Sequence, residues 1–339
     1  MKRPNGNDAR DTMASAIESA TSMTFTTRAL EVFKSDRPIA IRIYQGILRR
    51  AINGSYRFCE KLGFHPVLTH FYQPIPDSRT LGPSIWQKRY SLDGLNFEAP
   101  RQLALLQEFR QWKSEYDSFP FAKPNGRPEY FVNNGSFESV DGEVLYCMIR
   151  KFKPRRIIEI GAGYSTYVSA RAAAENSRGG APSCEHIAID PYARESLLAG
   201  LPKATRVIRE KVEEVSFAEF EKLGENDVLF IDSSHVVRIG GDVTHEYLEI
   251  LPRLKKGVVI HCHDIYLPAE YPQDLILRDH NFWTEQYLLH AFLLFNHTFE
   301  VLWAGSYMHL EHPDLLAETF ASYRRGSFWP KSFWIRKIS

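Results

Sequence analysis

A hydrophobic run in the second half of the chain ends in three titratable side chains. The stretch GVVIHCHDIYLP (257–268) brings His261, His263 and Asp264 into four consecutive positions. Imidazole and carboxylate groups this close together could bind a metal ion, exchange protons with a substrate, or simply form the polar end of a strand. Which of the three applies depends on the elements that position these residues.

Short β-rich runs alternate with helical stretches from Pro154 onward. This alternation is typical of βαβ units, and it predicts an α/β fold with a doubly wound, mostly parallel sheet of seven strands. The expected strands are residues 155–160, 185–190, 205–208, 227–232, 257–262, 299–305 and 332–338. Helices should fill the gaps, one of them in FWTEQYLLHAFLLF (282–295).

The carboxyl ends of neighbouring parallel strands meet in one crevice, where sheets of this kind bind ligands. The fourth expected strand ends in Asp232-Ser-Ser-His235, and the fifth is followed by His263 and Asp264. We therefore expect these four side chains to converge.

A glycine-containing turn joins the first expected strand to a helix that begins near Ser165. In RRIIEIGAGYST, Gly161 and Gly163 permit close approach of a ligand to the backbone and the helix end, and Glu159 adds a carboxylate. Asp190 ends the second strand, 31 residues after Glu159, where an acidic side chain can accept hydrogen bonds from ribose hydroxyls. An adenosine ligand accounts for both features; the alternative is that Asp190 only caps the following helix.

Four motifs at these spacings, IIEIGAGYST, IAIDPY, VLFIDSSH and LKKGVVIHCHDI, resemble those of class I S-adenosylmethionine-dependent methyltransferases. The nearest likeness is to the branch with macrocin-type sugar O-methyltransferases, with an added N-terminal region. It covers about residues 127–338. The resemblance implies a Rossmann-like methyltransferase fold with an antiparallel last strand and S-adenosylmethionine as cofactor. The implied cofactor-binding residues are Glu159, Gly161, Gly163, Ser165, Asp190 and Asp232, with Ser165 where many members have a third glycine.

The resemblance also implies chemistry at the strand tips. In the resembled sugar methyltransferases an Asp-x-x-His supplies a metal ligand and a general base, which Asp232 and His235 match, and an acidic pair after the next strand supplies further ligands. Here His263 precedes Asp264 in place of the first carboxylate. We expect His235 and His263 to be catalytic, and Asp232, His263 and Asp264 to bind Mg²⁺, Mn²⁺ or Fe²⁺. A metal-free mechanism with a histidine as base stays open.

His261 lies two residues before His263, so in a strand both should share a face while Cys262 points to the other. We expect His261 to be a core histidine. A non-haem iron site made of both histidines and Asp232 is disfavoured by the cofactor motifs.

The N-terminal part has a different texture. Residues 1–24 are predicted to be a disordered tail, residues 25–126 a helical and irregular region, and residues 127–339 the cofactor-binding domain. Two short helices are expected between residues 27 and 62, separated at Pro38. Residues 70–97 are rich in proline and should form an irregular segment that packs on a neighbouring domain, and a helix should follow over residues 100–116.

Composition limits the partners. The net charge is +1, so no basic field indicates nucleic acid. The four cysteines form no CxxC pair, and no run of 18 apolar residues predicts a membrane span, which favours a cytoplasmic location. Assembly into a homo-oligomer is left open by the sequence.

The expected function is O-methylation of a small-molecule or glycan acceptor, such as a hydroxyl of a sugar or secondary metabolite, with His235 as general base and a divalent metal as an open question. A dehydrogenase is disfavoured because the GxGxxG pattern is incomplete. The alternative from another class is a non-catalytic cofactor-binding partner in a glycan or natural-product assembly pathway.

Overall fold

The computed structural model describes residues 39–339 apart from 127, 196–198 and 202–204. The expected tail (1–24) and the first of the two expected N-terminal helices lie outside the described residues. Contacts divide the chain into two compact units, residues 1–80 and residues 81–339.

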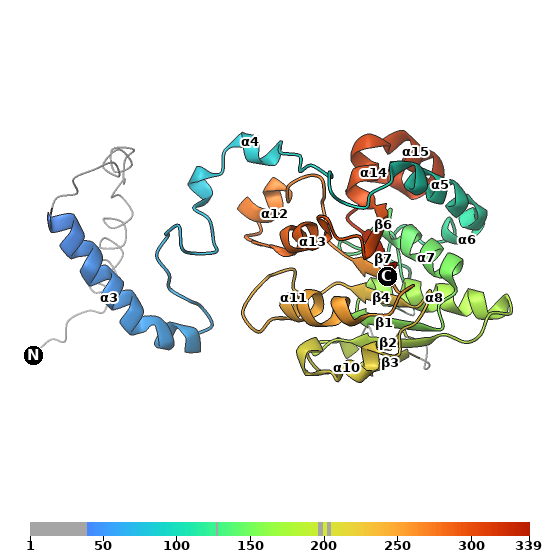
Figure 1. The fold of residues 1–339 in the computed structure, drawn as a ribbon, viewed down its shortest axis with the longest axis horizontal. Helices are drawn as coiled ribbons and strands as arrows, with labels where there is room; N and C mark the ends of the chain where they lie inside the picture. The colour runs from blue at the N-terminus through green and yellow to red at the C-terminus, as the bar shows by residue number, and fades with distance from the viewer. Residues whose placement is uncertain (1–38, 127, 196–198, 202–204) are drawn as a thin grey trace, which may run out of the picture. The chain divides into compact units, whose positions relative to one another are not determined.

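The larger unit is built on a seven-stranded sheet with the strand order β3-β2-β1-β4-β5-β7-β6 (Figure 1). The strands are β1 (Arg156–Ile160), β2 (Glu185–Ile189), β3 (Thr205–Ile208), β4 (Val228–Ile231), β5 (Val259–Cys262), β6 (Phe299–Ala304) and β7 (Phe333–Lys337). Only β7 runs antiparallel to its neighbours β5 and β6. The predicted doubly wound, mostly parallel sheet is confirmed, and each expected strand ends within two residues of the observed one.

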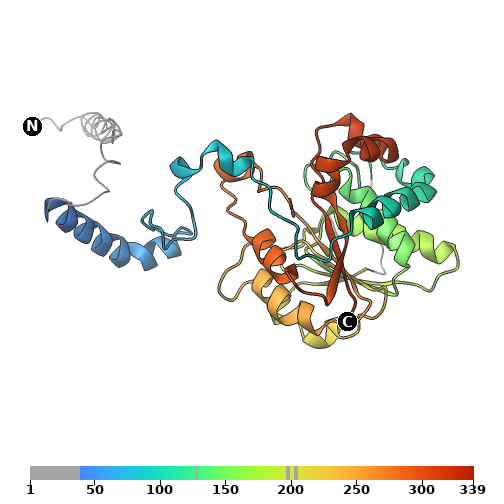
Figure 2. The same ribbon diagram turned by 45° about the horizontal axis from the view of Figure 1, so that its top comes forward.

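Helices cover both faces of this sheet (Figure 2), which explains why the central strand β4 is apolar throughout. In β4, Val228 and Phe230 join one core while Leu229 and Ile231 join the other. The first core includes α7 (Asp141–Phe152) and α8 (Tyr164–Arg178), and the second includes α13 (Glu285–Leu293). The alternation of side chains along a strand thus builds two hydrophobic layers at once.

The remaining helices are short. They are α4 (Pro83–Trp86), α5 (Ala99–Phe109), α6 (Lys113–Tyr116), α10 (Phe217–Phe220), α11 (Asp242–His245), α12 (Gln273–Leu277), α14 (Gly305–Glu311) and α15 (Pro313–Thr319). The helix expected over residues 100–116 is interrupted by a 3₁₀ turn at Arg110–Trp112, and α13 lies within the predicted stretch 282–295.

An irregular segment after residue 80 packs on the sheet unit. The N–H of Tyr90 donates to the carbonyl of Pro268 at 2.7 Å, and Phe97 forms a bridge with Val301. Residues 81–97 thus pack as we predicted for the whole segment 70–97, whereas residues 70–80 belong to the smaller unit and have no buried side chain. Residues 81–126 share one compact unit with the sheet, and a domain boundary at residue 127 stays a prediction about how the sequence is organised.

The smaller unit contains the helix α3 (Ile39–Lys61) followed by an irregular stretch to residue 80. None of the described side chains from residue 46 to residue 80 is buried. Among the described residues, no helix combines the length and apolar character needed to cross a membrane.

Candidate active site

A cavity of about 1100 Å³ opens where the chain leaves the carboxyl ends of β1, β2 and β4. The strand order reverses between β1 and β4, and open α/β sheets bind ligands at such a switch point. Its lining includes the turns after all three strands, among them Gly161, Gly163, Asp190 and Asp232.

The turn after β1 has to contain glycine. Gly161 has φ +88°, and a Cβ there would lie 2.1 Å from the carbonyl oxygen of Asp232. Any side chain would therefore push the turn away from the end of β4. The N–H of Gly163 donates to Thr166 Oγ1 at 3.0 Å and so caps α8. Gly163 also lines the cavity, so the positive N-terminal end of α8 lies at the cavity wall.

Asp190 connects two of the lining turns. Its Oδ2 accepts from the N–H of Ala162 at 3.2 Å, and its Oδ1 accepts from the N–H of Tyr192 at 2.7 Å. The bond from Tyr192 closes a turn after β2. That Asp190 only caps the following helix stays a prediction, because residues 196–198 lie outside the described residues. Each carboxylate oxygen can accept a second hydrogen bond, so the side chain can also bind a ligand in the cavity.

Glu159 and Ser165, two expected cofactor contacts, do not line the cavity. Glu159 is fully buried, accepts a hydrogen bond from Ser165 Oγ at 2.5 Å, and lies 3.1 Å from His186 Nε2. These contacts join β1, β2 and α8 beneath the turn, whereas Gly161, Gly163, Asp190 and Asp232 reach the cavity wall.

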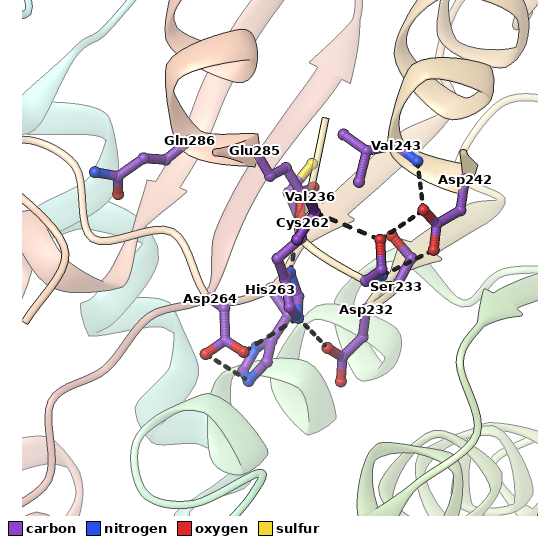
Figure 3. Close-up of polar contacts among 12 residues, drawn as sticks. Asp232, Ser233, Val236, Asp242, Val243, Cys262, His263, Asp264, Glu285 and Gln286 are labelled. Carbon is purple, nitrogen blue, oxygen red and sulfur yellow. Dashed lines mark hydrogen bonds and ion pairs between the residues drawn. The ribbon is translucent and has the colours of Figure 1, made fainter. Parts of the chain in front are cut away.

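His235 is the centre of a buried polar cluster beside Asp232. Its Nε2 lies 3.3 Å from Asp232 Oδ1 and 3.2 Å from Asp264 Oδ2, and its Nδ1 lies 2.8 Å from Glu285 Oε2. Figure 3 shows Asp232 and Asp264 approaching the cluster from two sides. His235 and Asp264 have positive φ values of 60° and 56°, an uncommon backbone conformation in which His and Asp are enriched.

Three carboxylates around one imidazole require a positive charge. Burial alone would lower the pKa of His235, but hydrogen bonds to Asp232 and Glu285 and the charge of Asp264 raise it well above its usual value. The charge can be a proton on Nε2 or a metal ion in its place, because the ligand atoms of Asp232, His235 and Asp264 all lie within 4.8 Å of one another.

Asp264 has a second cation beside it. Lys331 Nζ lies 2.7 Å from Asp264 Oδ1. Burial would raise the pKa of Asp264, but Lys331, His263 and His235 together lower it. Asp264 therefore remains ionised, and it joins β5 to the start of β7.

His263 lies beneath the cluster. Its ring packs against Phe137 with centroids 4.8 Å apart, and its Nε2 is 3.9 Å from Asp264 Oδ1. Among the expected ligands, Asp232 and Asp264 meet at His235, whereas His263 contacts only the far oxygen of Asp264.

We expected His261 to be a core histidine with its hydrogen bonds satisfied. It is a core residue, but neither ring nitrogen has a hydrogen-bond partner among the described residues. Its ring stacks on Phe230 at 4.1 Å and faces His263 at 5.5 Å, while Cys262 joins the opposite core. The expected sharing of one face by the two histidines is confirmed. Burial lowers the pKa of His261 well below its usual value, so the ring is neutral.

The loop after β4 is held by a second pair of carboxylates. Ser234 donates from its N–H and its Oγ to the two oxygens of Asp242, at 3.0 and 2.6 Å. Ser233 Oγ donates to Glu246 at 3.0 Å, and burial raises the pKa of Glu246 well above its usual value. These bonds fix the loop that carries Asp232 and His235.

Two members of the site were missed in the sequence. Glu285 begins α13, 50 residues after His235, and Lys331 lies between α15 and β7. Glu285 lies in the stretch 282–295, which we expected to be helical; Trp283 of the same stretch packs on His235, with centroids 4.5 Å apart.

Residues 158–265 match the sequence profile of a methyltransferase domain. The matched segment runs from β1 to Ile265 and so includes the glycine turn, Asp190 and the whole of the Asp232, His235 and Asp264 cluster. A protein of uncharacterised function from Archaeoglobus fulgidus is 29% identical over 164 residues, which is 46% of this chain and 73% of the relative.

Solved methyltransferases resemble the chain only distantly. The SAH-bound methyltransferase PaMTH1 of Podospora anserina is 17% identical with a TM-score of 0.36, over 69% of this chain and 88% of its own. An O-methyltransferase from Bacillus cereus in complex with SAH is 14% identical with a TM-score of 0.36, over 70% and 91%. These likenesses are too distant to assign a substrate.

Proposed function

We propose that this chain, an S-adenosylmethionine-dependent methyltransferase, transfers the methyl group of S-adenosylmethionine to a hydroxyl oxygen of a small-molecule or glycan acceptor. The observation that supports this acceptor is the meeting of Asp232, His235 and Asp264 beside the cavity. A neutral alcohol is a weak nucleophile, so its oxygen must be deprotonated or polarised as the methyl group arrives. Carboxylates and an imidazole next to the cofactor serve that need.

The cavity has room for both reactants. Sites for one small ligand usually enclose roughly 300–1,000 Å³, and this one encloses about 1100 Å³. In the proposed arrangement the Gly161–Gly163 turn and the start of α8 bind the methionine part of the cofactor. Asp190 accepts hydrogen bonds from the ribose hydroxyls, and Asp232 lies at the border between cofactor and acceptor.

The cluster fits a divalent metal ion. Its donors are two carboxylates and one imidazole, a set that suits Mn²⁺ or Fe²⁺ better than Mg²⁺. When bound there, such an ion would lower the pKa of a hydroxyl group that it coordinates. Asp232, His235 and Asp264 would hold it, with His235 as the ligand where we had expected His263.

His235 is therefore proposed as a ligand rather than as the general base. An imidazole accepts a proton only through a free lone pair. Nδ1 of His235 contacts Glu285, and Nε2 faces two carboxylates. If Nε2 already carries a proton, neither ring nitrogen has a free lone pair to accept the proton of the acceptor. The general-base mechanism would require that proton to leave before the acceptor binds.

Glu285 and Lys331 are proposed as positioning residues. Glu285 holds Nδ1 of His235, which directs Nε2 toward the cluster. Lys331 holds one oxygen of Asp264, which directs the other toward His235. In the reaction an O–CH₃ bond forms, the S–CH₃ bond breaks, the sulfonium becomes a neutral thioether, and the hydroxyl proton of the acceptor passes to water in the open cavity.

The experiment combines binding and turnover. Calorimetry should detect S-adenosylmethionine but not NAD, and Asp190→Ala should weaken that binding. Treatment with EDTA should stop methylation of hydroxyl acceptors, and Mn²⁺ should restore it. His235→Ala should lose both Mn²⁺ binding and turnover while cofactor affinity stays nearly intact. Full activity after complete chelation would refute the metal-assisted mechanism, and unchanged affinity in Asp190→Ala would refute the ribose assignment.

A cofactor-binding protein without turnover would have little use for the cluster. Burying three carboxylates and a histidine costs stability unless their interactions offset the loss of hydration. No observation in the described residues favours that alternative.

A further inference from the structure

The helix α3 has two chemically distinct faces. Ile47, Ala51 and Phe58 follow one another at helical spacing, with Leu48, Ile52 and Cys59 beside them. The opposite face carries Arg49, Asn53 and Arg57, each four residues after the last, together with the acid Glu60. Arg50 and Lys61 lie at its border, three residues after Ile47 and Phe58. Residues three or four apart lie on the same side of a helix, so an apolar stripe runs opposite a cationic one.

The apolar face is exposed at two of its largest side chains, whereas Leu48, Ile52 and Cys59 are partly buried. Ile47 is 60% exposed and Phe58 is 67% exposed. The chain after the helix continues the pattern, because Leu62, Phe71 and Tyr72 are 61%, 82% and 81% exposed. The rings of Phe71 and Tyr72 also contact each other, with centroids 4.2 Å apart.

Such a helix needs a surface to be stable. Isolated helices are marginal in water even when their sequences favour them, and Gly46 and Gly54 each cost about 1 kcal/mol relative to alanine. The described side chains of this unit supply no buried core. The conformation therefore depends on something that covers the stripe of Ile47 and Phe58.

Charge decides between the candidate partners. Residues 46–61 contain three arginines and one lysine against a single acid, Glu60. Two copies of this helix would repel each other, which disfavours pairing with a second chain. An anionic lipid surface attracts the cationic face, accepts the apolar stripe at the boundary of the acyl chains, and suits exposed aromatic side chains.

We infer that residues 46–75 form a peripheral anchor that places the enzyme on the surface of an anionic bilayer. The helix lies in the plane of the interface, because its cationic face prevents it from crossing. The inference rests on the smaller unit alone and is independent of the acceptor and of the metal.

The test uses the full-length protein and vesicles of two compositions, phosphatidylcholine alone and phosphatidylcholine with one quarter phosphatidylglycerol. We expect at least about tenfold tighter binding to the anionic vesicles, since each basic residue near the surface contributes to the affinity, and we expect release at high salt. Hydrogen exchange over residues 39–61 should slow when anionic vesicles are added.

Two pairs of matched variants locate the surface. The triple change Arg49→Gln, Arg50→Gln and Arg57→Gln should weaken binding by about 100-fold, whereas the triple change Arg178→Gln, Arg253→Gln and Arg278→Gln removes the same charge from the sheet unit and should have little effect. Ile47→Ser should weaken binding, whereas Leu248→Ser, which changes a side chain that is also 60% exposed, should not.

Three outcomes would overturn the inference. Equal binding to neutral and anionic vesicles would remove the electrostatic argument, and an equal loss in both triple variants would show that net charge matters rather than the helix. A dimer in light scattering that Ile47→Ser dissociates, without vesicle binding, would assign the stripe to a second copy. None of these readouts requires turnover, so failure here leaves the proposed reaction untouched.

Discussion

The two compact units of this protein differ in what determines their structure. In residues 81–339, two layers of buried side chains fix a sheet and hold the polar cluster at its edge. In residues 46–80 no described side chain is buried, and apolar and cationic residues face outward. The sheet unit thus holds the proposed site within its own core, whereas the smaller unit is the part for which we infer an external surface.

The largest expected difference concerns two phenylalanines. Phe230 in β4 is fully buried, so Phe230→Ala should lower the free energy of unfolding by about 3–5 kcal/mol, through lost burial and a cavity. Phe58→Ala, at a side chain that is 67% exposed, should change it by less than about 0.5 kcal/mol. Chemical denaturation of both variants measures the contrast, and equal losses would show that Phe58 packs in a core after all.

A pH effect should also belong to the sheet unit alone. Burial raises the pKa of Glu143 to about 7, although a hydrogen bond from Ser322 opposes the rise. The unfolded chain ionises this group near pH 4.5, so stability is fully present below that pH. It should fall by about 3 kcal/mol as the pH rises to 7.

Glu143→Gln should flatten this pH dependence. Relative to the natural protein, the variant should therefore gain stability at pH 8 compared with pH 5, measured by denaturant unfolding at both pH values. If the variant loses as much stability between pH 5 and pH 8 as the natural protein does, Glu143 does not cause the effect.

A smaller effect, on Mn²⁺ affinity, should distinguish the two buried carboxylates Glu285 and Glu270. Glu285→Gln leaves an acceptor for His235 but removes the charge, so Mn²⁺ affinity should fall about 10- to 100-fold. Glu270→Gln changes a carboxylate that binds Tyr90 and Tyr287 instead, and Mn²⁺ affinity should stay the same. Calorimetry with Mn²⁺ distinguishes them, and equal affinities in the two variants would remove Glu285 from the site.

The sequence predicts which residues lie at the carboxyl ends of the parallel strands. Parallel strands place their carboxyl ends at one edge, so the meeting of Asp232 and Asp264 could be expected from two apolar runs. The glycine at position 161 could be expected as well, because the turn after β1 passes the end of β4 too closely for a side chain.

The sequence does not predict which polar groups turn toward one another. His235 and Asp264 adopt positive φ values that redirect their side chains, and period-two alternation contains no information about such turns. Glu285 and Lys331 arrive from distant segments with no short-range pattern that links them to His235 or Asp264. For the same reason, the sequence did not predict that His235 rather than His263 would lie between Asp232 and Asp264.

The smallest expected effect is the removal of residues 1–80. If the smaller unit depends on an external surface, its deletion should leave the melting temperature of the sheet unit within about 1 °C, because a loss of 1 kcal/mol shifts domains of comparable size by roughly 2–4 °C. Methylation of a freely dissolved acceptor should continue, while binding to anionic vesicles should disappear. Scanning calorimetry provides the measurement, with Tyr90→Phe as the contrast, since that change removes a hydrogen bond to Glu270 within the sheet unit. A drop of several degrees on deletion would mean that the apolar stripe of α3 docks on its own chain, which would erase the difference between the two units.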